Sequence, residues 1–166
     1  MKQRKANNYF RKESEQIHRS QPPDAIYFSR SAEETHAFAK RLALTLPKRT
    51  TIAFSGDLGA GKTTFIRGLV EAIAQVDPRE VSSPTFNFLH IYEGIEKIYH
   101  FDLYRLPNER EFLSCGFDDF IHLDGICCIE WAERIPSILP KSCLKIHIKH
   151  AGEHLREIYI NRGESS

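Results

Sequence analysis

One short stretch, from Gly56 to Thr63, constrains the fold of this chain more than any other feature. Its sequence, GDLGAGKT, satisfies the phosphate-loop pattern G-x-x-x-x-G-K-[ST] at every fixed position. Residues 50–54 before it are mostly β-branched or aromatic, which predicts a strand, and the apolar residues after it recur every three or four positions, which predicts a helix. A strand, a glycine-rich turn and a helix in direct succession are the setting that this motif requires.

The residue types in this loop suit a polyphosphate ligand. Glycine and alanine let the backbone N–H groups approach an anion closely, and the helix that follows adds its positive N-terminal end. We expect the Lys62 ammonium to reach the β- and γ-phosphates, the Thr63 hydroxyl to bind magnesium, and Thr64 to lie against the α-phosphate. Asp57 is expected to be structural. The predicted nucleotide-binding residues of the loop are Gly56, Asp57, Leu58, Gly59, Ala60, Gly61, Lys62, Thr63 and Thr64.

Two acidic residues follow predicted strands, where open α/β sheets place their ligands. Glu130 comes directly after the apolar run 126–129 and is expected to hold magnesium, either directly or through water. Asp102 ends the run 98–101 and could orient the attacking water or the metal shell. The residue pattern does not rank Asp102 against Glu130.

Other residues have an open interpretation. Thr85 could present its hydroxyl to the γ-phosphate or its metal, or belong to an ordinary turn. Trp131 is either a core aromatic or part of the site wall. His147, His150 and His154 have a spacing only faintly like that of metal ligands, and the first two would face opposite sides of a strand, so a metal site there is not favoured.

The rest of the sequence predicts alternating elements. A capping box formed by Ser31 and Glu34 opens a helix that Pro47 closes. A hairpin is expected around Glu93 and Gly94. The predicted strands are 25–29, 50–54, 86–92, 97–102, 126–129, 144–149 and 156–160, and the further helices are 32–46 and 108–113. These elements indicate an α/β fold: a single-domain P-loop NTPase with a mixed β-sheet flanked by helices.

Charge divides the chain into two parts. The totals are nearly balanced, with 23 Lys and Arg against 22 Asp and Glu, but residues 1–20 hold six basic and two acidic side chains. We therefore expect residues 1–24 to be a flexible basic extension and residues 25–162 to be the ATPase domain. The extension is either a solvated tail or an arm that touches RNA or an acidic partner.

The apolar residues predict no contact with a membrane. No segment approaches the roughly 20 apolar residues that span a bilayer, and the N-terminus lacks the apolar run of a secretory signal, so we expect a cytoplasmic protein. The four cysteines include no C-x-x-C pair, and Cys127 and Cys128 lie in an apolar run. The cysteines are therefore expected to be buried free thiols.

Four segments together resemble one family. They are GDLGAGKTT, SSPTF, HFDLYR at residues 100–105 and ICCIEWAER at residues 126–134. In this order they resemble the bacterial ATPase family (TsaE-type) that takes part in making the tRNA modification N6-threonylcarbamoyladenosine (t6A), over about residues 26–150. The resemblance implies a cytoplasmic protein that binds ATP and Mg2+ and hydrolyses ATP very slowly. It also implies that the protein acts in a complex with the threonylcarbamoyl-transferase subunit and its paralogous partner subunit, and meets tRNA indirectly through that complex.

The resemblance also assigns roles to individual residues. It implies catalytic roles for Lys62, Asp102, Glu130 and Thr85, metal contacts for Thr63, Glu130 and Asp102, and nucleotide contacts for Trp131, Ala32 and Gly152. This sequence departs from the family in the arm before residue 25 and in the C-terminal strand region.

Two other functions use the same loop chemistry. A small-molecule or nucleoside kinase would need several arginines in a lid, and residues 103–134 offer only Arg105, Arg110 and Arg134. A nucleotide-dependent binding module would need no chemistry at all. The small number of arginines favours the ATPase over the kinase, while slow hydrolysis by the isolated protein would not distinguish the ATPase from the binding module.

Overall fold

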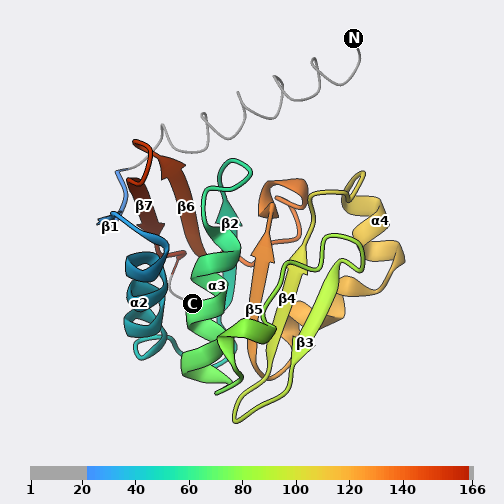
Figure 1. Cartoon of the computed structure of the whole chain (residues 1–166). Coiled ribbons are helices and arrows are strands. Elements are labelled where there is room, and N and C mark those ends of the chain that lie inside the picture. The colour runs from blue at the N-terminus through green and yellow to red at the C-terminus, as the bar shows by residue number, and fades with distance from the viewer. Residues whose placement is uncertain (1–21, 165–166) are drawn as a thin grey trace.

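The computed structural model describes residues 22–164, so most of the predicted extension 1–24 lies outside the described residues. Seven strands form one sheet in the order β1-β7-β6-β2-β5-β4-β3 (Figure 1). The four central strands β6, β2, β5 and β4 are parallel, and β3, β7 and β1 each run antiparallel to the strand beside them. The sheet is therefore mixed, as predicted. The strands are β1 (Ala25–Ser29), β2 (Thr51–Ser55), β3 (Leu89–Tyr92), β4 (Ile98–Asp102), β5 (Ile126–Glu130), β6 (Leu144–His150) and β7 (Arg156–Asn161).

Helices cover the two faces of the sheet unequally. The long helices α2 (Ala32–Ala43) and α3 (Lys62–Ile73) lie side by side on one face, while α4 (Glu109–Ser114) lies near β4 and β3, at the end of the sheet far from β1 (Figure 1). Three short 3-10 helices complete the fold: η1 (Pro78–Glu80), η2 (Phe117–His122) and η3 (Ala132–Arg134). Because side chains alternate along a strand, Ile98 of β4 packs in the core under α3, and Phe101 packs in a second core against α4 and η2.

The predicted start of α2 is confirmed. The Ser31 hydroxyl accepts the backbone N–H of Glu34 at 3.1 Å, as in a capping box. The Glu34 carboxylate accepts the N–H of Arg30 instead of that of Ser31. The helix ends at Ala43, three residues before the predicted end at residue 46, because the N–H groups of Leu44 and Thr45 bond to carbonyls three residues back.

The predicted strand 86–92 is too long at its start. The carbonyl of Pro84 accepts N–H groups from both Asn87 and Phe88, at 3.2 and 2.7 Å, so the chain turns here. Phe88 has a positive φ of 63°, and β3 begins only at Leu89. Phe86, which alternation placed in a strand, is 76% exposed.

A 3-10 helix was not predicted from the sequence. η2 brings Phe117 and Phe120 onto Phe101, with ring centroids 5.4 and 6.1 Å apart. A 3-10 helix of six residues is too short to show an apolar period, so no pattern in the sequence predicted it.

The cysteine prediction is confirmed for three residues and wrong for one. Cys127, Cys128 and Cys143 are free and buried, and burial raises the pKa of each thiol. Cys115 is exposed because it follows the last turn of α4. No helix in residues 22–164 is both long enough and apolar enough to cross a membrane.

Candidate nucleotide site

The loop between β2 and α3 has a backbone that requires glycine. Gly56, Gly59 and Gly61 have φ values of 129°, 76° and 111°, which residues with a side chain rarely adopt. At Gly56 a Cβ atom would also lie 2.1 Å from the carbonyl oxygen of Ile148 on β6. Gly61 caps α3 without a side-chain hydrogen bond, and the first turn of the helix has no acidic residue. Its N–H groups are thus oriented for an anion.

Lys62 lies inside the loop rather than in solvent. It is 4% exposed, and its Nζ donates to the carbonyls of Gly56 and Asp57 at 2.7 and 2.8 Å. The ammonium is also 4.2 Å from the centre of the Trp131 ring, a cation–π distance. Burial lowers the pKa of Lys62, and the nearby carboxylates, Glu130 first, act in the opposite direction.

Glu130 receives two hydrogen bonds on one oxygen. Its Oε1 accepts from the Thr63 hydroxyl at 2.8 Å and lies 2.9 Å from Nε2 of His100. Glu130 is 3% exposed and His100 is fully buried. The end of β5 therefore carries a buried carboxylate in direct contact with the hydroxyl that the sequence predicts as a magnesium ligand.

Asp102 lies beside Glu130 at the end of the neighbouring strand, in register with it. Its Oδ2 accepts the hydroxyl of Thr85 at 2.8 Å and that of Ser83. Its Oδ1 accepts the N–H of Tyr104 at 2.9 Å. Segment 82–88 is thus tied to Asp102 through two hydroxyl groups, of which the sequence pointed only to Thr85.

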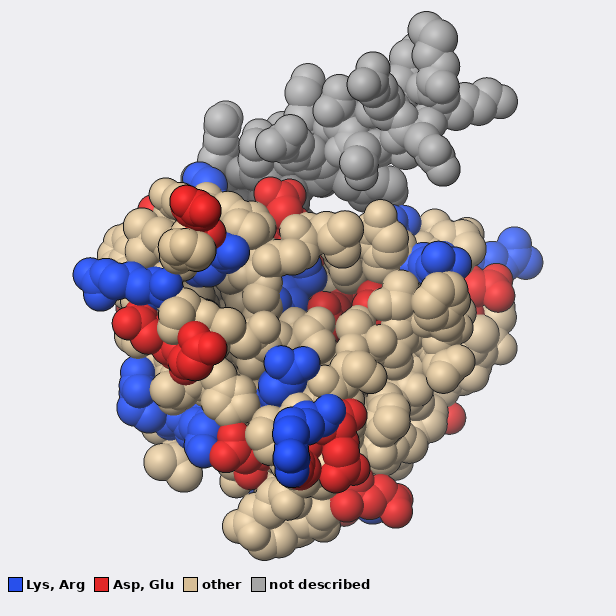
Figure 2. Space-filling model, in the orientation of Figure 1, with Lys and Arg blue, Asp and Glu red and all other residues tan. Residues whose placement is uncertain are grey.

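Trp131 follows Glu130 in a left-handed conformation, with φ of 59°. Its ring contacts both Lys62 and Tyr104, and the Tyr104 ring centroid is 5.0 Å away. Trp131 is therefore part of the wall beside the lysine. Glu133, on η3, is largely buried near Lys62 and Asp57, and burial raises the pKa of its carboxyl group. In Figure 2, basic and acidic atoms lie together in a recess at the centre of this face.

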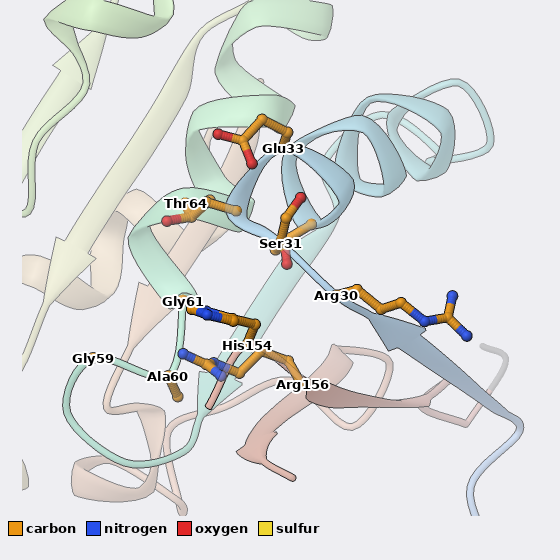
Figure 3. Close-up of a pocket in the computed structure, with 11 residues that line it drawn as sticks. Arg30, Ser31, Glu33, Gly59, Ala60, Gly61, Thr64, His154 and Arg156 are labelled. Carbon is orange, nitrogen blue, oxygen red and sulfur yellow. The ribbon is translucent and has the colours of Figure 1, made fainter. Parts of the chain in front are cut away.

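A hollow of about 390 Å3 opens on the other side of the loop. It is bounded by the start of α2, the loop and the connection from β6 to β7 (Figure 3). The side chains of His154 and Arg156 extend toward Ala60 and Gly61, whereas Arg30 points away from the loop (Figure 3). The lining residues are Arg30, Ser31, Ala32, Glu33, Thr35, Gly59, Ala60, Gly61, Thr64, His154 and Arg156.

The structure arranges the predicted residues in two groups on either side of the loop. Ala32 and Thr64 line the hollow, while Gly152 does not, although its carbonyl accepts a hydrogen bond from Arg156 at 3.3 Å. The second group gathers around the ends of β4 and β5 and consists of Lys62, Thr63, Thr85, Asp102, Glu130 and Trp131. A chain of phosphates lying along the loop would thus have the hollow at one end and the acids at the other.

Several residues of this site were missed in the sequence. His154 was considered only as a metal ligand, and Arg156 only as part of a strand. Nothing in the pattern connects them with Ser31, more than 120 positions earlier in the chain. The antiparallel pairing of β1 with β7 brings them together.

The site offers few protein ligands for a metal. Residues 22–164 contain no group of three or more His, Cys, Asp or Glu side chains that could hold an ion. The Ser55 hydroxyl lies 2.9 Å from Nδ1 of His147. Mg2+ in nucleotide sites usually has only one or two protein ligands, because phosphates and waters supply the others, and Thr63 and Glu130 fit such a site.

The chain is similar to known proteins of one family. A family model described as "Threonylcarbamoyl adenosine biosynthesis protein TsaE" matches residues 29–158. A relative from Bacillus subtilis, named tRNA threonylcarbamoyladenosine biosynthesis protein TsaE, is 43% identical over 127 residues, which are 76% of this chain and 78% of the relative. A relative of the same name from Treponema pallidum is 35% identical over 80% of this chain and 96% of its own length.

A solved structure is similar as well. The crystal structure of YdiB from Bacillus subtilis matches with a TM-score of 0.66 and 34% identity, and the match covers 84% of this chain and 86% of that one.

Proposed function

This chain belongs to the TsaE family of threonylcarbamoyl adenosine biosynthesis proteins, and from that membership we propose that it is the ATP-binding subunit for t6A modification of tRNA. In this role it binds ATP with Mg2+ and hydrolyses it slowly. It works with the threonylcarbamoyl-transferase subunit and its paralogous partner subunit, and it meets tRNA through that complex.

One observation carries this proposal. A complete phosphate loop holds Lys62 and Thr63 beside Glu130, with the Thr63 hydroxyl 2.8 Å from the carboxylate. Phosphoryl transfer needs positioning and electrostatic stabilisation more than covalent chemistry, and these are the groups that provide both.

Each residue has a distinct task in this proposal. Lys62 leaves the carbonyls of Gly56 and Asp57 and binds the β- and γ-phosphates, and the loop N–H groups hold the rest of the chain of phosphates. Thr63 and Glu130 hold Mg2+, which when bound neutralises the charge that develops on the phosphate oxygens. Asp102, with Thr85, positions the attacking water, and Trp131 excludes solvent beside Lys62.

The hollow is the proposed site for the nucleoside. Thr64, which is predicted to contact the α-phosphate, lines the hollow together with the start of α2 and the β6–β7 connection. A nucleoside attached to that phosphate would therefore lie in the hollow. Its volume of about 390 Å3 lies within the range of small-molecule sites.

The test pairs a loop variant with a matched surface variant. Lys62→Ala removes an ammonium group that makes charge-assisted contacts with phosphate, so ATP affinity should fall by roughly tenfold to a hundredfold. Lys97→Ala removes an exposed lysine that pairs with Glu93 at 3.1 Å in the β3–β4 hairpin, and affinity should not change. Equal ATP binding by the two variants would contradict the proposal.

A second measurement concerns the complex. ATP hydrolysis and t6A formation are compared with and without the transferase pair. Both should increase when the pair and the wild-type chain are combined, and Lys62→Ala should abolish the increase. If the pair stimulates neither reaction, the proposed role in t6A synthesis is wrong.

The kinase alternative is not favoured. Of the three arginines between residues 103 and 134, Arg134 donates to the carbonyls of Tyr104 and Leu106 at 3.1 and 3.2 Å, and Arg105 lies 4.3 Å from the centre of the Phe86 ring. Because two of these arginines are held by such contacts, they are poorly suited to forming a lid that closes over the phosphoryl acceptor of a kinase. Stoichiometric phosphorylation of a metabolite would establish the kinase instead.

A further inference from the structure

His100 occupies a position where an apolar residue would be expected. It lies in the middle of β4 between Tyr99 and Phe101, and its side chain is fully buried, with a relative exposure of 0%. Its ring lies near that of Tyr92, with centroids 6.1 Å apart. A buried imidazole without hydrogen bonds would cost free energy there, so its polar contacts indicate why a histidine is present.

The imidazole makes a single polar contact within residues 22–164. Its Nε2 is 2.9 Å from Oε1 of Glu130, while its Nδ1 is buried with no hydrogen-bond partner. A carboxylate accepts hydrogen bonds, so we assign a ring proton to Nε2, the nitrogen that faces Glu130. The one polar interaction that explains a histidine at this position is therefore the N–H that points at Glu130.

The oxygen that His100 holds is also the one that Thr63 uses. Oε1 accepts from both groups, and among the described residues the other oxygen of Glu130, Oε2, has no hydrogen-bond partner. With Oε1 fixed from two sides, the carboxylate cannot rotate freely. Oε2 and the lone pairs of the Thr63 hydroxyl are left for a ligand.

We propose that His100 is a positioning residue of the nucleotide site: its Nε2–H fixes the Glu130 carboxylate against Thr63 and thereby sets the affinity for magnesium-bound ATP. The inference rests on the proposed function. His100 touches neither nucleotide nor metal and acts only through Glu130.

Two amide substitutions provide a matched test. In His100→Gln the amide nitrogen reaches about as far from the backbone as Nε2 does, and in His100→Asn it reaches only about as far as Nδ1. Both variants bury the same amide group, so the free-energy cost of burying it should be similar in the two. The hydrogen bond to Glu130 is the difference between them. Tyr99→Phe is the control, because it removes a hydroxyl that donates to the Asp124 carbonyl at 3.2 Å in the opposite core.

Trp131 provides the readout. It is the single tryptophan of the chain, and its ring contacts Lys62, so its fluorescence should report on ATP binding at the loop. ATP is titrated once with EDTA and once with Mg2+, and the ratio of the two affinities is compared between variants. Thermal melting confirms that each variant is folded.

The expected result is a loss of affinity that depends on magnesium. His100→Asn should reduce this ratio by about tenfold to a hundredfold, the usual effect of removing a group that orients a metal ligand. Its affinity in EDTA should stay within about twofold of wild type, since the loop contacts are unchanged. His100→Gln should restore most of the ratio, and Tyr99→Phe should match wild type.

Three results would overturn the inference. One is a wild-type ratio in His100→Asn. Another is a loss of affinity in His100→Asn that is equal with EDTA and with Mg2+, which would make His100 a residue of the core only. The third is failure of the wild-type chain to bind ATP under either condition, which would overturn the proposed function as well and is seen before any variant is compared.

Discussion

Gly56 combines two constraints that usually occur apart. Its φ of 129° is a conformation that strains any residue with a side chain, and its α-carbon faces the backbone of β6. A Cβ atom would lie 2.1 Å from the Ile148 carbonyl oxygen, and a backbone atom cannot move aside as a flexible side chain can. The residue therefore determines both the path of the loop and its contact with the sheet.

We expect Gly56→Ala to destabilise the protein by roughly 3 kcal/mol, the sum of backbone strain and steric overlap. Chemical denaturation gives the free energy of unfolding. Gly59→Ala is the control, since Gly59 also has a positive φ, of 76°, but has no atom within 4 Å of a Cβ. Equal losses in the two variants would mean that the contact with Ile148 is unimportant.

The two buried acids should have separable effects. Glu130 contacts the Thr63 hydroxyl, whereas Asp102 contacts Thr85 and Ser83. Glu130→Ala should weaken ATP binding in the presence of magnesium by about tenfold or more. Asp102→Ala should leave ATP binding nearly unchanged and slow hydrolysis by about a hundredfold, as expected for a group that positions water.

Binding titrations and single-turnover hydrolysis separate these effects. If either alanine variant keeps both the wild-type affinity and the wild-type rate, that residue is not part of the site. The sequence alone could not rank the two acids, because both end apolar strands.

At the scale of elements, α2 and α3 are joined by close packing and by an ion-pair network. Gly68 allows the approach, since a Cβ there would lie 2.5 Å from the carbonyl oxygen of His36. Across the same contact, the Glu71 carboxylate lies 2.5 Å from both Nε2 of His36 and Nζ of Lys40. The hydrogen bonds from Lys40 and then His36 lower the pKa of Glu71.

This lowered pKa predicts how the contribution of Glu71 depends on pH. The folded protein favours the ionised form, so the stabilisation is fully present above the pKa that Glu71 has in the unfolded chain, ordinarily 4.5. It is lost as the pH falls through the lowered folded value. Glu71→Gln should reduce the free energy of unfolding by about 0.5–1 kcal/mol at pH 7, and the difference from wild type should shrink as the pH falls below 4.5.

Denaturation at several pH values checks this prediction. Glu93→Gln removes a more exposed pair with Lys97 and should have little effect at any pH. A difference between Glu71→Gln and wild type that stays constant down to acid pH would show that the ion pairs do not cause it.

Local sequence predicted most elements because their signals are local. The caps, the apolar periods and the glycine-rich turn lie within a few residues of the elements that they define, and β1 matches its predicted range, 25–29. Where a tertiary contact or an irregular turn determines the backbone conformation, the local sequence pattern did not predict it. Residues 86–88 alternate like a strand, yet Asn87 and Phe88 donate to the Pro84 carbonyl in a turn, and β3 begins only at Leu89.

The site was predicted unevenly for the same reason. The loop and the acids were found because each has a motif and a place at the end of a strand. The contacts between them, such as that of His100 with Glu130, depend on the order of β4 and β5 in the sheet. No local pattern encodes that order.

Residues 22–164 contain two hydrophobic cores and all of the predicted nucleotide-site residues. Removing residues 1–21 should therefore change the melting temperature by less than about 2 °C, equivalent to less than about 1 kcal/mol. Removing residues 1–24 should leave the fold intact but also cost the bond between the Asp24 carboxylate and the Arg162 N–H, which is worth about 1 kcal/mol. Differential scanning calorimetry of the two truncated chains tests the predicted boundary, and a large drop for the shorter truncation would place residues 1–21 in the folded domain.

The position of β2 in the middle of the sheet has a consequence for biosynthesis. Its neighbours on either side, β5 and β6, begin only at residues 126 and 144. While the ribosome is still translating the intervening codons, an apolar strand therefore has both edges unpaired and is open to wrong pairing or to a chaperone. Ile148, the neighbour of Gly56, is translated later still, so the nascent chain cannot make the contact between the binding loop and β6 until residue 148 has left the exit tunnel.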